Sequence, residues 1–389
     1  MHLILVIGAL PPPINGQSKN LERIAGDIAA CPGVRLVRRS VAAGALEKSV
    51  VTHARKAGRV VAAWVTMLAL SLRYRKRSLY LVADGGRGLV YTWGLAATAK
   101  ALGYRIVLQH RTFEYVRAPN PLMARIDALR ARSAGAQVFL CESMARRFRE
   151  AYGSAVGPSH VVGNLSQYAG FAGPQDRPEP LVADAPIRVT MLSNLIPEKG
   201  VDTFLATARL VLARSQACQF TLAGPVPHAD TRAAIEALVA HAPEQVRWLG
   251  PLYGEDKREL LKRTDVFVFP TRYRFEAQPN VVLEAMRLGA TVVAPDRGCI
   301  ASDVAETGVV IEAGRESDPK AYAEVLLAYA AEGGRALLNA RRQAAFEAAA
   351  HGVVVGRAAY AQFLSDLTGV DANRLPVAGE PGSTGRASV

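Results

Sequence analysis

The sequence contains few cysteines, and their spacing offers no metal-binding pair. Four cysteines occur in 389 residues, far apart and without any Cys-x-x-Cys motif. A structural zinc site needs closely spaced ligands, so we expect none here. Such sparse cysteine usage is typical of proteins in a reducing cytoplasm, which is where we expect this chain to act.

Several phosphate- and metal-binding motifs are also missing. The chain has no Gly-x-x-x-x-Gly-Lys and no Gly-x-Gly-x-x-Gly motif, which argues against Walker-type kinases and dinucleotide-dependent enzymes. It also lacks an Asp-x-Asp pair, which commonly binds a divalent cation. We therefore expect neither a metal ion nor a resident cofactor.

No apolar stretch is long enough to span a membrane. The longest, residues 60–72, is shorter than the roughly 20 residues that a spanning helix needs. The apolar start, residues 1–8, has no basic leader and is soon followed by three prolines. This start predicts a buried first strand rather than a signal peptide.

Acidic residues are in the minority, and the formal net charge is +13. Such an excess favours a polyanionic partner. Interleaved aromatics and RNA-binding signatures are missing, so we expect no nucleic-acid partner. Basic residues flank the apolar stretch, which favours docking of segment 55–77 on an anionic membrane, although a core helix with solvated ends would show the same pattern. The basic side chains are Arg55, Lys56, Arg59, Arg73, Arg75, Lys76 and Arg77.

Short apolar runs alternate with segments of helical periodicity in both halves of the chain. This alternation predicts α/β domains with parallel sheets covered by helices on both faces. We expect an N-terminal domain over 1–170, a proline-rich linker over 171–186, a C-terminal domain over 187–350, a C-terminal helix over 351–369 and a disordered tail over 370–389. The predicted strands are Leu3–Gly8, Val34–Arg38, Leu79–Ala83, Arg105–Gln109, Gln137–Cys141, Arg188–Leu192, Phe220–Ala223, Val246–Leu249, Val266–Phe269, Thr291–Ala294 and Gly308–Ile311.

The most informative segment follows the predicted strand 266–269. Pro279 and Asn280 open a helix there, since proline suits a first helical position and asparagine suits a cap. The unpaired N–H groups of such a helix start can bind an anion such as a diphosphate. Glu276 precedes the helix and Glu284 lies inside it, and carboxylates accept hydrogen bonds from neighbouring hydroxyls. A solvated helix face would give the same spacing by chance, so the prediction depends on this context.

A second loop follows the predicted strand 188–192. It leads through Asn194 to Lys199-Gly200 and then into a helix. A lysine here can meet phosphate oxygens as a point charge, and the glycine lets the backbone approach closely. In isolation, Lys199 would be interpreted as a surface residue of an ordinary turn.

Together these segments resemble the retaining glycosyltransferases of family 4. Residues 193–200 are similar to the family's "Gly-Arg-Leu … Lys-Gly" loop, and residues 276–285 to its "Glu-Gly-x-Pro-Asn … Glu-Ala" segment. Residues 161–164, 222–225 and 246–250 also resemble family segments, so the likeness covers nearly the whole chain. It implies the GT-B fold: two Rossmann-like domains facing across a cleft, with C-terminal helices crossing back to the first domain.

By this resemblance, the C-terminal half binds a nucleoside-diphosphate sugar. Lys199, with the helix start at Pro279 and Asn280, would hold the diphosphate. Glu276 would face the hydroxyls of the sugar, and Glu284 would bind the ribose.

The resemblance also implies two site residues in the N-terminal half. Gly16 closes a loop that starts at Pro11, and it would approach the diphosphate. His110, at the end of a strand, would lie beside the transferred sugar, although a lone histidine in that position is more often structural.

Two positions depart from the family pattern. Asn194 stands where the family has an arginine beside the donor phosphate, and Ala277 stands where it has a glycine. Either Arg272 or Arg297 is a candidate to restore the missing charge.

The implied reaction moves a hexose-type sugar, with retention, to a glycan or to a polyprenyl- or lipid-linked acceptor. It would belong to bacterial polysaccharide or cell-envelope glycan synthesis, peripheral to the inner face of the plasma membrane. Two alternatives stay open: a nucleotide-sugar 2-epimerase, and a degenerate member that binds a nucleotide sugar or lipid without catalysis.

Overall fold

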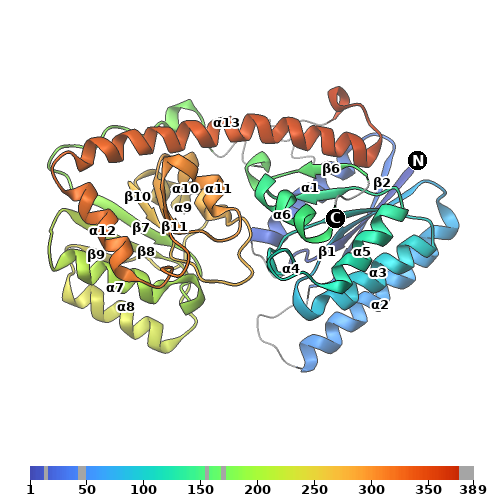
Figure 1. The fold of residues 1–389 in the computed structure, drawn as a ribbon, viewed down its shortest axis with the longest axis horizontal. Helices are drawn as coiled ribbons and strands as arrows, with labels where there is room; N and C mark the ends of the chain where they lie inside the picture. Colours follow the sequence, from blue (N-terminus) through green and yellow to red (C-terminus); the bar gives the residue numbers. More distant parts are fainter. Residues whose placement is uncertain (13–15, 43–49, 154–156, 168–171, 376–389) are drawn as a thin grey trace. The chain divides into compact units, whose positions relative to one another are not determined.

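The computed structural model describes residues 1–12, 16–42, 50–153, 157–167 and 172–375, and it contains two compact units (Figure 1). The first unit comprises residues 1–169 and 354–389, and the second comprises residues 170–353. Of the segments discussed above, residues 13–15, residues 168–171 at the predicted start of the linker and residues 376–389 of the predicted tail lie outside the described residues. The predicted disordered tail includes residues 370–375, but Leu375 is buried in the core of the first unit.

The first unit is built on a parallel sheet with the strand order β2-β1-β3-β4-β5-β6. All seven residues of β1 are buried, as expected for a continuous apolar run in the middle of a sheet with both faces covered. Its elements are β1 (His2–Gly8), α1 (Gly16–Ala30), β2 (Val34–Ser40), α2 (Val50–Arg73), β3 (Arg77–Val82), α3 (Leu89–Ala101), β4 (Arg105–Gln109), α4 (Glu114–Arg117), α5 (Pro121–Arg132), β5 (Gln137–Phe139), α6 (Glu142–Tyr152) and β6 (Ser159–Val161).

One face of this sheet forms a core with α1 and with the C-terminal end of α13 (Gly334–Thr368). Tyr80 of β3 packs against Phe363 of α13, with ring centroids 5.8 Å apart. Asp366 of the same helix forms an ion pair with Arg105 at 2.7 Å. The end of the long helix is therefore part of the first unit, although the helix begins in the second.

The second unit is built on a parallel sheet with the strand order β12-β11-β10-β7-β8-β9. Its elements are β7 (Ile187–Leu192), the 3₁₀ turn η4 (Pro197–Lys199), α7 (Val201–Leu212), β8 (Cys218–Ala223), α8 (Ala229–His241), β9 (Val246–Trp248), α9 (Gly254–Lys262), β10 (Val266–Val268), α10 (Asn280–Arg287), β11 (Thr291–Pro295), α11 (Ile300–Val304), β12 (Val309–Ile311) and α12 (Pro319–Ala330).

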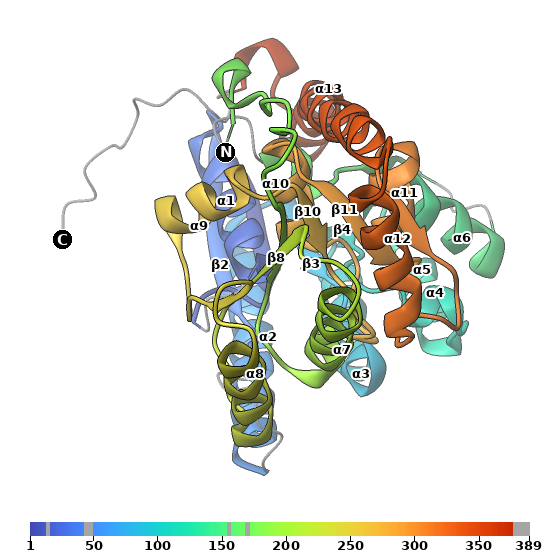
Figure 2. The same cartoon turned by 90° about the vertical axis from the view of Figure 1, so that its left-hand side faces the viewer.

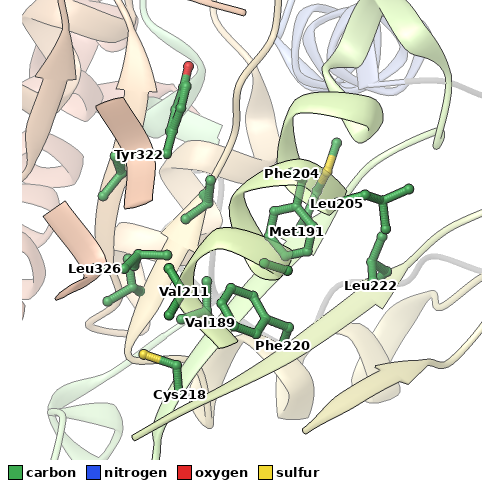
Figure 3. Close-up of a cluster of buried hydrophobic side chains, with 14 of the residues drawn as sticks. Val189, Met191, Phe204, Leu205, Val211, Cys218, Phe220, Leu222, Tyr322 and Leu326 are labelled. Atoms are coloured by element: carbon green, nitrogen blue, oxygen red, sulfur yellow. The ribbon is translucent and has the colours of Figure 1, made fainter. Parts of the chain in front are cut away.

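The main core of the second unit lies on the sheet face covered by α7, α8 and α12. Helices α7 and α12 lie side by side there (Figure 2). Figure 3 shows Phe204 and Val211 of α7 close to Phe220 of β8, with Leu326 of α12 nearby. The rings of Phe204 and Phe220 meet edge to face at 5.9 Å. This core fixes the positions from which the loops at the carboxyl ends of the strands leave the sheet.

The α/β class with two parallel sheets, predicted from the alternating pattern, is confirmed. The sheet of the first unit has a sixth strand, β6, which the sequence pattern does not reveal. Its three residues, Ser159–Val161, are polar or partly exposed at the sheet edge, so no apolar run marks it. The apolar stretch 60–72 forms the second half of the longer helix α2.

The proline-rich segment 172–186 packs on the second unit. Asp176 is buried, and its carboxylate pairs with Arg258 of α9 at 2.5 Å. Further along, the backbone N–H of Leu181 donates to Asn339 of α13. Within the described ranges, no helix combines the length and apolar character that a membrane span requires.

Candidate functional site

The second unit has a topological switch point between β7 and β10. These two strands are neighbours in the centre of the sheet, and the chain moves outward from them in opposite directions. The loops that follow them, residues 193–200 and 269–279, therefore leave the same edge of the sheet beside each other. In open α/β sheets, this is the place where ligands bind.

Lys199 and Glu276 meet at this switch point, one from each loop. The Nζ atom of Lys199 donates to Oε2 of Glu276 at 2.5 Å. The hydroxyl of Thr271 donates to the same carboxylate oxygen at 3.1 Å. Both charged side chains are largely buried, so a short, charge-assisted interaction forms at the edge of the sheet.

Gly200 lets these two loops come together. Its φ angle is +83°, in the left-handed region that favours glycine. A Cβ atom at this position would lie 2.0 Å from the carbonyl oxygen of Pro270. Any side chain at Gly200 would therefore push the Lys199 loop away from the loop that carries Glu276.

Aromatic rings surround the ammonium group of Lys199. Its Nζ atom lies 4.7 Å from the ring centroid of Tyr273 and 5.5 Å from that of Phe269, within cation–π distance. Burial, together with the nearby Glu276 and Glu198, raises the pKa of Tyr273. Its hydroxyl therefore stays neutral and able to donate a hydrogen bond near pH 7.

Helix α10 begins at Asn280, where the sequence predicts a helix start. The expected roles are exchanged, because Pro279 is the N-cap residue and Asn280 is the first helical residue. The first turn of the helix presents backbone N–H groups beside the Glu276 loop.

The backbone at Ala277 shows no sign of needing a glycine. In the described part of the chain, the non-glycine residues with positive φ are Ala134 and Ala305. Ala277 therefore adopts an ordinary backbone conformation and does not need the family's glycine.

Glu284 lies inside α10 and pairs with a lysine that the sequence analysis did not single out. The Nζ atom of Lys257, on α9, donates to Oε1 of Glu284 at 2.6 Å. Glu284 is buried, whereas Lys257 is partly exposed. Lys257 and Lys199 therefore each pair with one of the two glutamates.

Asn194 is exposed in the β7 loop. Arg272 and Arg297 are the two candidates to replace the charge that is missing at Asn194. Arg272 donates hydrogen bonds to two side chains at the start of α7, to Asp202 at 2.8 Å and to the hydroxyl of Thr203 at 3.4 Å. Arg297 contacts Glu316 at 3.4 Å, and its buried Nε atom has no hydrogen-bond partner. Arg297 therefore donates to fewer acceptors within the protein than Arg272 does.

In the first unit, His110 follows β4 and is fully buried. It stacks on Phe139 with ring centroids 4.5 Å apart, and its Nδ1 atom lies 2.9 Å from the hydroxyl of Tyr115. Burial lowers the pKa of His110 to about 3, with a smaller contribution from the Arg130 charge. The imidazole is therefore neutral at physiological pH, and its Nε2 atom has no partner.

The structure thus groups some of the predicted residues and leaves others separate. Lys199 and Glu276 are in contact, and Glu284 lies further along the helix that starts after the Glu276 loop. Gly16 is the first residue of α1 in the first unit and is exposed.

Thr271, Lys257 and Tyr115 are the contact residues that sequence reasoning missed. Thr271 had a usable signal, because it follows the strand-ending Pro270 directly. No local sequence pattern marks Lys257, because its partner Glu284 is 27 residues away in the sequence. Within the described ranges, no group of three His, Cys, Asp or Glu side chains is placed to hold a metal ion.

Comparison with known proteins gives the arrangement a family context. Residues 186–332, most of the second unit, match the family described as Glycosyl transferases group 1. A GDP-mannose-dependent monoacylated alpha-(1-6)-phosphatidylinositol monomannoside mannosyltransferase from Corynebacterium glutamicum is 26% identical over 200 residues. That match covers 49% of this chain and 51% of the relative, so this chain spans about half the length of the curated relative.

Solved structures resemble the chain over nearly its whole length. Sucrose-phosphate synthase from Thermosynechococcus elongatus has a TM-score of 0.63 at 16% identity and covers 95% of this chain and 100% of its own. An E. coli protein bound with UDP-2-fluoro glucose has a TM-score of 0.64 at 12% identity, with the same coverage. Anabaena HepE in complex with UDP has a TM-score of 0.61 at 16% identity and covers 94% of this chain and 100% of its own. At these identities the likeness establishes the fold, and the GT-B prediction is confirmed.

Proposed function

We propose that this chain, a group 1 glycosyltransferase with the GT-B fold, transfers a hexose from a nucleoside-diphosphate donor to a glycan or lipid-linked acceptor. The proposed reaction retains the anomeric configuration and needs no metal ion. The observation that carries the proposal is the contact between Lys199 and Glu276 at the β7/β10 switch point.

The chemistry of this contact suits a donor that combines a diphosphate with a sugar. In the proposed complex, the Lys199 ammonium and the first N–H groups of α10 face the diphosphate, while the Glu276 carboxylate accepts hydrogen bonds from sugar hydroxyls. When the bond from the anomeric carbon to the diphosphate breaks, the leaving group takes the electron pair and gains negative charge. Positive charge that is already in position stabilises this transition state more than the ground state.

The acceptor hydroxyl then forms the new bond to the anomeric carbon, and its proton leaves with the diphosphate. His110 is proposed to contact the transferred sugar through Nε2, since its Nδ1 atom is already bonded to Tyr115. With its pKa lowered to about 3, His110 would act as a neutral hydrogen-bonding group and not as an acid. Retention is proposed from the family resemblance of residues 276–285.

Glu284 is proposed to bind the ribose of the donor. It lies more than one turn into α10, beyond the helix start assigned to the diphosphate. The Corynebacterium relative uses GDP-mannose, and two of the similar structures contain UDP or a UDP-sugar. These relatives support a nucleoside-diphosphate donor without choosing the base.

A lipid-linked acceptor is supported by an exposed apolar surface on α2. We call it the α2 stripe: Val61, Trp64, Val65, Leu68 and Leu72. These residues follow helical spacing and lie on one side of the helix, while Val60, Ala63 and Met67 face the core. Exposure reaches 86% at Leu72 and 63% at Val65.

Helix α3 lies beside α2 (Figure 1). It carries two more exposed apolar side chains, Val90 and Trp93. Exposed basic side chains border the α2 stripe, with Arg55 towards the start of α2 and Arg73, Arg75 and Lys76 at its end. The other basic residues of segment 55–77 have structural contacts: Lys56 pairs with Asp84, Arg59 donates to Ala42 and Arg77 donates to Leu102. A basic rim around an apolar stripe fits an anionic membrane surface, and we propose peripheral binding at the cytoplasmic face.

Vesicle binding tests the membrane part of the proposal. The full chain should sediment with vesicles that contain anionic lipid at low salt and be released at high salt. A Val65→Glu/Leu68→Glu double variant should lose this binding, whereas Val354→Glu, at an exposed apolar position of α13, should retain it. Equal sedimentation of all three proteins would rule out the α2 stripe as the contact.

Thermal unfolding with a panel of nucleotide sugars tests the donor part. A ligand that binds only the folded state stabilises it by about 2.7 kcal/mol when its concentration is 100 times its Kd. The true donor should therefore raise the unfolding temperature more than the other nucleotide sugars do. Product analysis then tests the reaction. Transfer with an unchanged anomer, insensitive to a chelator, is expected; an inverted product or loss of activity with chelator would contradict the mechanism.

The two alternatives predict different products from the same assay. A 2-epimerase would convert the nucleotide sugar without an acceptor, and a non-catalytic member would bind the donor without turnover. Asn194 in place of the family's arginine is the feature that favours the non-catalytic alternative.

A further inference from the structure

Four arginines are buried in the described part of the chain, and each has at least one guanidinium nitrogen without a hydrogen-bond partner. Arg111 differs from the other three because two of its nitrogens lack a partner. Arg130 pairs with Asp127, Arg287 donates to the carbonyl of Ala172, and Arg342 donates to the carbonyl of Glu179 and pairs with Asp265. Arg111, which is only 7% exposed, has no hydrogen-bond or ion-pair partner for Nε or Nη2. A buried charge without a partner is costly, so this arrangement needs an explanation.

The two unpartnered nitrogens of Arg111 form one edge of the guanidinium group. Nε–H and the adjacent Nη2–H point in parallel, and this edge matches the two oxygens of a phosphate or carboxylate. Burial lowers the pKa of Arg111, but an arginine keeps its charge at physiological pH. The protein therefore presents a complete bidentate donor edge, and no described carboxylate occupies it.

Two further unpartnered polar side chains lie on the same part of the sheet. Both side-chain amide atoms of Gln109 and the hydroxyl of Tyr80 are buried without partners. In the parallel register, Tyr80 of β3 is opposite Val107 and Val82 is opposite Gln109, so Tyr80 and Gln109 face the same side of adjacent strands. Arg111 follows two residues after Gln109, and its charge acts on Tyr80.

Gln109 is the last residue of β4 and Arg111 follows it, whereas Tyr80 lies two residues before the end of β3. β3 adjoins β1 at the point where the strand order of the first sheet reverses. Ligands in open α/β sheets bind at such a place. Tyr80, Gln109 and Arg111 all have buried donors without a partner, and all three lie on or just after the central strands β3 and β4. Together they indicate a site for an oxygen-rich anion.

We propose that Arg111, Gln109 and Tyr80 form an anion-binding subsite in the first unit, which takes a phosphate or carboxylate group of the acceptor. The assignment to the acceptor rests on the proposed function, because the donor is assigned to the second unit. The Arg111 edge holds two oxygens of the anion, and the Gln109 amide and Tyr80 hydroxyl donate to the remaining oxygens.

Inorganic phosphate is the probe for the test. Binding to the full chain is measured by calorimetry and thermal unfolding, with chloride at matched ionic strength as the reference and acetate as a separate arm. All comparisons use a Lys199→Met background, so that phosphate bound near Lys199 does not contribute. A larger shift with phosphate than with acetate identifies a phosphate subsite, and the reverse identifies a carboxylate subsite.

Arg111→Gln should reduce anion affinity at least about tenfold, as expected for the loss of hydrogen bonds to a charged group. Arg111→Lys keeps the charge without the planar edge and should also bind weakly. Arg149→Gln, at an exposed position of α6, is the matched control and should bind like the parent.

A purely structural role for Arg111 predicts a different outcome. Without phosphate, Arg111→Gln should unfold at the same or a higher temperature than the parent, because it removes an unpaired buried charge. A clear loss of stability together with unchanged anion binding would overturn the proposal. So would the absence of any anion effect in the parent.

Nucleotide binding, measured without the Lys199 substitution, separates this proposal from the proposed function. Arg111→Gln should bind GDP and UDP as the wild type does. Loss of nucleotide binding in this variant would assign Arg111 to the donor and overturn the acceptor subsite. If no nucleotide binds the wild-type chain, the donor assignment fails, while the phosphate measurement still decides whether the subsite exists.

Discussion

The ammonium of Lys199 lies 2.5 Å from the carboxylate of Glu276, although the two residues are 77 positions apart and follow different strands. Thr271 donates to the same carboxylate oxygen, which fixes its orientation. The Lys199 ammonium and the Glu276 carboxylate therefore neutralise each other when no ligand is bound. A donor with both phosphate oxygens and sugar hydroxyls can satisfy the lysine and the glutamate separately.

Glu276→Gln should lower kcat at least about 100-fold, because removal of an interaction that preorganises the transition state costs about this much. Steady-state kinetics with the donor identified by thermal unfolding provides the measurement. Thr271→Val is the milder comparison and should cost about tenfold, since it removes one hydrogen bond to the carboxylate.

A double-mutant cycle separates catalysis from stability. Lys199→Met and Glu276→Gln should each lower the free energy of unfolding by about 1–3 kcal/mol, since each removes one hydrogen bond to a charged group. The double variant should recover part of this loss, because no charge is left unpaired. If both single variants keep full activity, the pair has a structural role only.

Glu284→Gln should weaken nucleotide binding through the ribose. The matched test compares GDP with 2′-deoxy-GDP on both proteins. The wild type should lose about tenfold in affinity for the deoxy ligand, whereas Glu284→Gln should bind the two ligands almost equally, because the carboxylate that would contact the hydroxyl is gone. An equal preference for ribose in both proteins would contradict the assignment.

Tyr115→Phe should lower kcat about tenfold while leaving the donor KM unchanged, because it removes the bond that orients His110. Tyr152→Phe is a matched control: its hydroxyl donates to the backbone carbonyl of Tyr115 at 2.5 Å, whereas the side-chain contact to His110 Nδ1 comes from the Tyr115 hydroxyl. Both variants should lose about 1 kcal/mol of stability, so only the kinetic difference reports on His110. Equal kcat in the two variants would remove Tyr115 as a positioning residue.

Arg297→Met should weaken donor binding several-fold, whereas Arg272→Met should not. Arg297 has an unpartnered Nε, and its loop joins the Glu276 loop through a hydrogen bond from Cys299 N to the carbonyl of Ala277 at 2.6 Å. Arg272 is already satisfied at the start of α7. Calorimetric titration with nucleotide checks both, and unchanged affinity in both variants would remove the compensation hypothesis for Asn194.

The fold could be predicted from the sequence because apolar runs and helical periodicity are local signals. Strand β1 and helix α10 are clear examples, since an apolar run and a Pro-Asn start mark them. Strand β6 has no such signal and depends on pairing with β5 at the sheet edge. Its formation is determined by tertiary contacts.

The candidate site was only partly predictable for the same reason. The positions of Lys199, Glu276 and Glu284 could be inferred from loops after strands, but their partners could not. Lys257 reaches Glu284 from a neighbouring helix, and no sequence spacing encodes that contact. Arg111 looks like an ordinary basic residue in the sequence, and only its burial without a partner makes it notable.

Asp303 gives the protein a predictable pH dependence next to the α10 loop. Its carboxylate accepts from Nε2 of Gln278 at 3.0 and 3.1 Å. Burial raises the pKa of Asp303 from 3.8 to about 7, against the smaller lowering effect of Gln278. The folded state therefore binds more protons than the unfolded state between about pH 4 and pH 7.

The free energy of unfolding should fall through this range as the pH rises, because the carboxyl group must ionise in a buried position. The contribution is fully present below about pH 4 and lost above about pH 7. Asp303→Asn cannot ionise, so its stability relative to the wild type should increase from pH 5 to pH 8 in urea unfolding. Asp318→Asn is the control: Arg315 lowers the pKa of this partly exposed carboxyl, so its effect should be constant over the same range. A constant difference for Asp303→Asn as well would show that its carboxyl group is already ionised at pH 5.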